Sequence, residues 1–272
     1  MIKIAGKLTE IADMPTHYDE GSVQRHVLET MAASDATYSF ADIDQLRFEL
    51  DVRDSVVKAS RDLSGSYLSF SGFHDAKCNP KFWDRTDNGG FRLKKGVSAG
   101  AAVADIFAHG EEYATECATA MQIVYYKALL DVYGEERFDK VFPDIFLMDW
   151  AIGNPLMAGL GNPKPVADTL LGDRAYFKND DVDPKAPWWQ GENVIVLPDG
   201  LYYGHGVGIG TAEQIIRDLN SNRKQGATVF AHLLDTLSRP DFKGLARAGL
   251  DNNTEENRAP LVWHLPQPLF SV

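Results

Sequence analysis

One cysteine stands where a nucleophile is expected: Cys117, in the stretch Tyr113-Ala-Thr-Glu-Cys117-Ala-Thr-Ala. An apolar segment begins directly after it, so its thiol falls in the first turn of a predicted helix. Unpaired backbone N–H groups and the positive end of the helix dipole favour the thiolate there. The thiolate attacks acyl carbons, so this placement predicts a cysteine nucleophile. A cysteine that starts an apolar helix is also a common core residue, and the motif alone leaves both interpretations open.

The second cysteine, Cys78, lies in His74-Asp-Ala-Lys-Cys78-Asn-Pro, a predicted loop with no helix start behind it. Nothing in that setting favours its thiolate. Two cysteines and scattered histidines offer no pair at the spacing of a zinc site, so we expect no metal and no cofactor. Two cysteines in 272 residues make no disulfide framework and favour a reducing compartment.

A carboxylate and an imidazole follow in the run Trp189-Gln-Gly-Glu192-Asn-Val-Ile-Val-Leu197-Pro-Asp-Gly-Leu-Tyr-Tyr-Gly-His205-Gly206. If Asp199-Gly200 is a two-residue hairpin turn, the register places Val194 opposite His205. Glu192 then lies diagonally on the same face, about 7–8 Å away at the backbone. The two side chains would converge on one side of a sheet. A solvated cross-strand ion pair explains the same pattern equally well in the absence of Cys117.

The elements that must position these residues follow from the apolar pattern and the turn signals. The segment 117–132 is apolar around most of its circumference, which predicts a helix inside the fold. Thr211-Ala-Glu-Gln214 has the form of a capping box. Further helices are predicted at 23–31, 42–60, 99–109, 211–226 and 227–238, a hairpin at 82–93, and an antiparallel sheet at 145–150, 175–177, 192–197 and 201–205.

Composition excludes several classes of protein. The formal net charge of −12 repels phosphate backbones, so we expect no nucleic-acid partner. The sequence has no run of about 18 apolar residues and no secretory signal, so we expect no membrane association and no export by the usual route. Neither a repeat nor a linker indicates a second domain. We expect one catalytic domain at 1–240 and a loosely packed C-terminal extension at 241–272.

The sequence resembles the small spore-coat-type transglutaminases of Bacillus and its relatives, which are protein-glutamine gamma-glutamyltransferases. The resemblance covers roughly residues 1–240, although 151–171 and the loop around Cys78 depart from the family pattern. The motifs that carry it follow in order: Glu116-Cys117-Ala118-Thr119-Ala120, Tyr125-Tyr126, Asp149-Trp150, Gly172-Asp173, Tyr176-Phe177-Lys178-Asn179, Trp189-Gln-Gly-Glu192-Asn193-Val194-Ile195 and Gly204-His205-Gly206-Val207-Gly208-Ile209.

The resemblance implies an α+β fold with an NlpC/P60-like (papain-like) core, in which the nucleophile helix packs on an antiparallel sheet among additional helices. It assigns Cys117 as nucleophile and Glu192 as its partner, with His205 and Glu116 as further catalytic residues. Papain-like analogy instead nominates His205 as the base, and this choice stays open. The resemblance also implies that Trp150, Tyr176 and Trp189 line the route by which substrate side chains reach the thiol.

The implied reaction is calcium-independent cross-linking of proteins through glutamine and lysine side chains, with a thioester intermediate and release of ammonia. The aspartates Asp180, Asp181 and Asp183 are better explained as a solvated turn than as a calcium site. The expected location is the cytoplasm, with a role in the spore coat, and the oligomeric state is not predicted. The alternatives are an NlpC/P60-like thiol amidase or peptidase, and a non-catalytic coat or scaffold protein.

Overall fold

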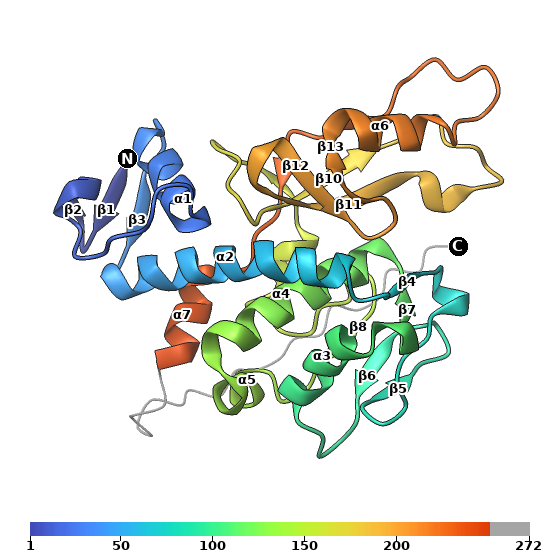
Figure 1. Ribbon diagram of the computed structural model, residues 1–272, viewed down its shortest axis with the longest axis horizontal. Helices are drawn as coiled ribbons and strands as arrows, with labels where there is room; N and C mark the ends of the chain where they lie inside the picture. The colour runs from blue at the N-terminus through green and yellow to red at the C-terminus, as the bar shows by residue number, and fades with distance from the viewer. Residues whose placement is uncertain (251–272) are drawn as a thin grey trace, which may run out of the picture.

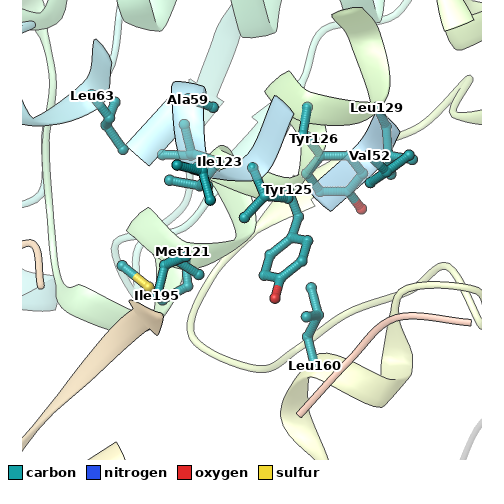
Figure 2. Packing of buried hydrophobic residues seen from close by; sticks show 14 of the residues in the cluster. Val52, Ala59, Leu63, Met121, Ile123, Tyr125, Tyr126, Leu129, Leu160 and Ile195 are labelled. Carbon is teal, nitrogen blue, oxygen red and sulfur yellow. The ribbon is translucent and has the colours of Figure 1, made fainter. Parts of the chain in front are cut away.

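Helix α4, Cys117–Tyr133, lies at the centre of the computed structural model, which describes residues 1–250 (Figure 1). Its side chains are buried on most sides, as the apolar sequence predicts. Helix α2, Ile43–Ser64, crosses it, and Figure 2 shows Val52 and Ala59 of α2 packed beside Leu129 and Ile123 of α4. Buried apolar side chains from α2, α4 and the large sheet join one hydrophobic core, which holds α4 in place.

The other helices surround this pair, and polar side chains set where several of them begin. The Asp42 carboxylate accepts a hydrogen bond from the Gln45 N–H at 2.8 Å and caps α2. The Thr211–Gln214 capping box is confirmed at the start of α6. None of the helices within residues 1–250 is long and apolar enough to cross a membrane. The surrounding helices are α1 Val23–Ala33, α3 Ala99–Ala108, α5 Glu135–Val141, α6 Ala212–Asn220 and α7 Phe242–Leu250.

The largest sheet has five antiparallel strands in the order β13-β12-β11-β10-β14. Its central strand β11 packs against α4, and α6 follows the edge strand β13 directly (Figure 1). The mixture of helices and antiparallel strands confirms the predicted α+β class. The strands are β10 Arg174–Lys178, β11 Gly191–Val196, β12 Leu201–Gly204, β13 Gly208–Thr211 and β14 His232–Leu233.

Four smaller sheets cover the flanks, with the orders β2-β1-β3, β5-β6-β8, β4-β7 and β15-β9. The predicted hairpin at 82–93 is confirmed by the β5–β6 pair. Strand β7 leads directly into Cys117, and its parallel partner is β4. The strands are β1 Ile2–Ile4, β2 Lys7–Leu8, β3 Tyr38–Phe40, β4 Ser69–Phe70, β5 Trp83–Arg85, β6 Phe91–Leu93, β7 Ala114–Thr115, β8 Phe146–Leu147, β9 Lys164–Pro165 and β15 Thr236–Leu237.

Two of the predicted helices need correction. Helix α6 ends at Asn220 instead of 226, because the Ser221 and Asn222 side chains both donate to the Asp218 carbonyl, at 2.7 and 3.0 Å, and compete with the helical pattern. The predicted helix at 227–238 is wrong. That segment is extended, since β14 pairs with the open edge of β10, where the backbone groups need partners.

The predicted strand at 145–150 is shorter than expected and lies elsewhere. Only Phe146–Leu147 is extended, and it pairs with β6 rather than with the five-stranded sheet. The remainder of the segment turns sharply at Asp149, which has a φ of 44°. A residue in this left-handed region cannot continue a strand.

The packed structure continues past the predicted boundary at residue 240. Phe242 and Leu245 of α7 are buried against the rest of the fold, and the Tyr133 hydroxyl donates to the Leu245 carbonyl at 2.6 Å. The prediction of loose packing is therefore wrong for residues 242–249. They form an amphipathic helix, whose apolar residues are interspersed with polar ones in the sequence. The remaining part of that prediction, 251–272, lies outside the described residues.

Candidate active site

Cys117 is the first residue of α4, and the residue before it caps the helix. The Glu116 carboxylate accepts hydrogen bonds from the N–H groups of Ala118 and Thr119, the latter at 2.8 Å. These are the unpaired donors that the sequence assigned to a Cys117 thiolate. The Glu116 carboxylate therefore interacts with the positive end of the helix dipole in place of the Cys117 sulfur.

The pKa of the Cys117 thiol is raised to about 12, principally by burial and then by the charges of Glu192 and Glu116. Hydrogen bonds from Asn193 act in the opposite direction. The expectation of a thiolate favoured by the helix start is thus wrong for the resting site. Removal from water and two nearby carboxylates outweigh the helix end. At neutral pH the resting group is a thiol, and it needs a base to become a nucleophile.

Glu192 lies on β11 and is almost completely buried. Burial raises its pKa to about 8, while its hydrogen bond from the Gly206 N–H, 3.0 Å long, acts to lower it. A Cβ on Gly204 would approach the Glu192 carboxylate to 2.8 Å, so this glycine leaves the space that the buried group occupies. A carboxyl with a pKa near 8 exchanges its proton close to neutral pH, as a general base must.

The register that places His205 differs from the prediction by one residue. The turn contains three residues, because Leu197 pairs with Leu201, and Asp199 and Gly200 both have positive φ, 62° and 69°. Val194 therefore faces Gly204 rather than His205. A slip of one residue moves a side chain to the opposite face, so Glu192 and His205 do not converge through the ladder as expected.

His205 instead contacts the strands beside the nucleophile. Its Nε2 lies 3.2 Å from the Ser69 carbonyl oxygen, which only accepts, so this nitrogen carries the proton. The imidazole also lies 6.0 Å from the Phe70 ring, and burial lowers its pKa. Ser69 belongs to β4, which pairs with β7, the strand that leads into Cys117. These contacts suit an orienting role.

A pocket of about 550 Å³ opens at the thiol. Among the described residues, Glu192 and His205 do not belong to its wall. Tyr176 can lie over β11 because residue 191 is glycine, where a Cβ would meet the tyrosine hydroxyl at 2.2 Å. The wall of the pocket combines aromatic and polar side chains, among them Phe70, Trp150, Tyr176, Trp188, Glu116, Asp149, Arg174 and Asn193.

Of the three aromatics implied for the substrate route, Trp150 and Tyr176 line the pocket and Trp189 does not. Trp189 is half-buried against the core, whereas Trp188 reaches the pocket and is 56% exposed. The two tryptophans are adjacent in a short 3₁₀ turn, Pro187–Trp189, yet only Trp188 belongs to the pocket wall. Sequence alone offered no means of choosing between them.

Trp150 is positioned by helix α4. The Asp149 N–H donates to the Thr119 hydroxyl at 2.9 Å, and the Gln122 amide donates to the Asp149 carbonyl. These bonds hold the left-handed turn at Asp149 and direct Trp150 into the pocket. The helix that carries Cys117 thus also fixes one wall of the site.

Two polar residues of the site were not assigned by the sequence. The Asn193 Nδ2 donates to the Cys117 Sγ at 3.1 Å, and the Arg174 guanidinium holds the other end of that amide. The available signal was their position. Arg174 directly precedes the predicted strand 175–177 and Asn193 lies near the start of the predicted strand 192–197, so both are polar next to segments that are expected to be buried.

Comparison with known proteins shows which family the chain resembles. A family model described as Protein-glutamine gamma-glutamyltransferase matches residues 1–249. An enzyme of that name from Halalkalibacterium halodurans is 39% identical over 240 residues, which are 88% of this chain and 82% of that protein. One from Bacillus cereus is 41% identical over 220 residues, 81% of this chain and 79% of its own length. The solved transglutaminase of Geobacillus stearothermophilus, without its C-terminal extension, superposes with a TM-score of 0.69 at 44% identity and covers 75% of this chain and 96% of its own.

Proposed function

The chain belongs to the protein-glutamine gamma-glutamyltransferase family, and from that premise we propose that Cys117 is the nucleophile with which it joins glutamine to lysine side chains. The observation that carries the assignment is the thiol itself. It is half-buried at the start of α4, opens onto an aromatic pocket, and lies near the carboxyl group of Glu192, whose pKa is about 8.

In the proposed reaction the thiol of Cys117 gives its proton to Glu192 as sulfur attacks the glutamine carboxamide carbon. The tetrahedral adduct expels ammonia, to which the protonated Glu192 returns the proton, and a thioester remains. A lysine amine then attacks the thioester and gives a proton to Glu192, which passes it to the departing sulfur, so that the thiol and the unprotonated carboxylate are restored as the isopeptide bond forms. Water in place of the amine would hydrolyse the thioester and give glutamate. The aromatic walls favour cross-linking because they exclude solvent from the thioester.

The roles of the other residues follow from their contacts. Glu116 caps α4 and lies at the pocket. We propose that it positions the start of the helix and that its carboxylate can partly replace Glu192. His205 contacts the Ser69 carbonyl on β4, and we assign it the role of orienting the strands beside the nucleophile. Trp150, Tyr176 and Trp188 are the aromatic walls that guide the substrate side chains.

The packing of α4 on β11 supports a papain-like core of the NlpC/P60 type. We propose a single catalytic domain that includes α7, since α7 packs against α2. Any C-terminal extension then begins after that helix.

We extend the proposal to calcium independence. Asp180 pairs with Lys178 at 2.6 Å, and Asp181 pairs with Lys224 at 2.7 Å while accepting two backbone N–H groups. These carboxylates are already engaged by cations and amides within the protein. A cytoplasmic enzyme that cross-links spore-coat proteins is the biological role that fits the relatives in Bacillus.

The test is incubation with a glutamine-bearing protein and a labelled primary amine, with and without a calcium chelator. We expect covalent labelling and release of ammonia in both conditions. Cleaved peptide without labelling would instead indicate a thiol peptidase. A folded protein whose thiols resist alkylation and that labels nothing would indicate a non-catalytic scaffold. Labelling that stops in chelator and returns with calcium would overturn calcium independence alone.

A further inference from the structure

We propose that Asn193 is a further catalytic residue, whose side-chain N–H stabilises the Cys117 sulfur as it becomes negative, and that Arg174 is the positioning residue that fixes this amide. The inference rests on the proposed role of Cys117 as nucleophile.

The first step in the argument is the direct contact with the reacting atom. The Asn193 Nδ2 lies 3.1 Å from the Cys117 Sγ. Among the side-chain hydrogen bonds of residues 1–250, this is the one that reaches the sulfur. A hydrogen bond to an ionised sulfur is stronger than one to the neutral thiol, so the contact favours the thiolate over the resting state.

The second step is the chemistry that orients the amide. The Arg174 Nε donates to the Asn193 Oδ1 at 2.9 Å, and its Nη2 donates to the same oxygen. A guanidinium has only donors, so the amide must turn its oxygen toward Arg174. Its NH₂ group is then forced toward the sulfur. Without Arg174 the amide could rotate by half a turn and present an oxygen, which would repel a thiolate.

The third step is how Arg174 itself is held. Its Nη1 donates to the Ser238 hydroxyl at 2.7 Å, and its guanidinium carbon lies 4.5 Å from the centre of the Trp150 ring. In the described structure Arg174 is buried and forms no ion pair with a carboxylate within 4.0 Å, unlike the buried Arg53. Its positive charge is therefore available to the nearby sulfur, and the charges of Arg174 and an ionised Cys117 favour one another.

The experiment measures alkylation of Cys117 by iodoacetamide as a function of pH, in a Cys78→Ala background, together with kcat and KM for amine incorporation. We expect Asn193→Ala and Arg174→Gln to raise the apparent pKa of alkylation and to lower kcat about 10- to 100-fold, with a smaller change in KM. Arg174→Lys retains charge and a donor and should recover part of both losses. Asn193→Asp places a carboxylate at the sulfur and should be the most damaging.

The matched control is Arg239→Gln, which removes a half-buried arginine that pairs with Asp173 and has no hydrogen bond to Asn193. We expect a lower unfolding temperature in this variant with an unchanged alkylation profile. If Arg174→Gln is too unstable to purify, Ser238→Ala removes one support of the guanidinium and should give a smaller shift in the same direction.

An alkylation profile that stays unchanged in Asn193→Ala, or in the folded Arg174 and Ser238 variants, overturns the inference, whatever happens to stability. The failure of the proposed function is distinct from this outcome. It would appear as amine incorporation that survives Cys117→Ala.

Discussion

Two clusters of buried charge meet at consecutive residues, Asp173 and Arg174, and they differ in how completely the charges are paired. Asp173 accepts from Arg53 at 2.9 Å and from Arg239 at 2.6 Å, while Arg53 also donates to Glu49 at 3.0 Å. Each of these charges has an opposite charge beside it. The cluster joins α2, the start of β10 and the segment before α7, and it lies apart from the pocket wall.

On the other side of the same backbone, Arg174 holds a neutral amide and a hydroxyl, and Glu192 accepts from backbone N–H groups. The pKa of Glu192 rises to about 8 because its burial is not offset by a cation. The comparison teaches that complete pairing holds charges fixed and contributes to the architecture. Incomplete pairing leaves a proton that can move near neutral pH, which is what acid–base chemistry needs.

The comparison is sharpened most by Cys117→Ala, which we expect to abolish amine incorporation because no other thiol reaches the pocket among the described residues. Cys78→Ala should retain most activity, since burial raises the pKa of Cys78 to about 11 and its thiol lies outside the pocket. Incorporation of a labelled amine into a glutamine-bearing protein measures both. Equal loss in the two variants would contradict the assignment.

Replacement of Glu192 by alanine should lower kcat about 100-fold or more, a typical general-base contribution. Glu116→Ala should have a smaller effect, because its carboxylate mainly caps α4, and the double variant should be inactive. Steady-state kinetics of amine incorporation measure these values.

The alternative Cys117–His205 dyad predicts a different order of activities among these variants. If Glu192→Ala and the double variant keep near-normal rates while His205→Ala is inactive, then His205 is the base. We expect His205→Ala to be damaging but partial, because the ring contacts the Ser69 backbone carbonyl and has an orienting role.

The paired cluster should respond in stability rather than in chemistry. Asp173→Ala leaves Arg53 buried with one fewer carboxylate, so we expect a loss of about 3–5 kcal/mol in the free energy of unfolding. Denaturant unfolding measures this loss. At temperatures where the variant remains folded, the pH dependence of Cys117 alkylation should match that of the parent protein. A shifted alkylation profile would show that the two clusters are not separable.

The remaining expected effect is the dependence on pH. The unprotonated Glu192 is the base, so kcat/KM should rise as pH passes through about 8, the raised pKa of this group. Stability should change in the opposite direction. A pKa raised in the folded state contributes stability below the unfolded value of 4.5, and that contribution is lost as pH rises through about 8. Glu192→Gln should flatten the stability slope, and parallel pH–rate and pH–unfolding series test both signs.

The sequence by itself determined the elements whose signals are local. The apolar circumference of 117–132 predicted a buried helix, and Thr211–Gln214 predicted a helix start, because periodicity and capping depend on neighbouring residues. The prediction of a helix at 227–238 was wrong for the opposite reason. Its backbone completes the edge of a strand more than 50 positions away in sequence, at Phe177–Lys178, and that partner cannot be read locally.

The chemistry-bearing residues divide in the same way. Motif spacing singled out Cys117, Glu192 and His205, yet only the tertiary structure decided the state of each. The thiol pKa depends on burial and on carboxylates that the fold brings beside it, both of which outweigh the helix end. A third turn residue, Pro198, shifted the hairpin register and separated Glu192 from His205. Asn193 acquires its contact with sulfur only because Arg174, 19 residues earlier on the neighbouring strand, orients its amide. Such orientation exists only between packed side chains.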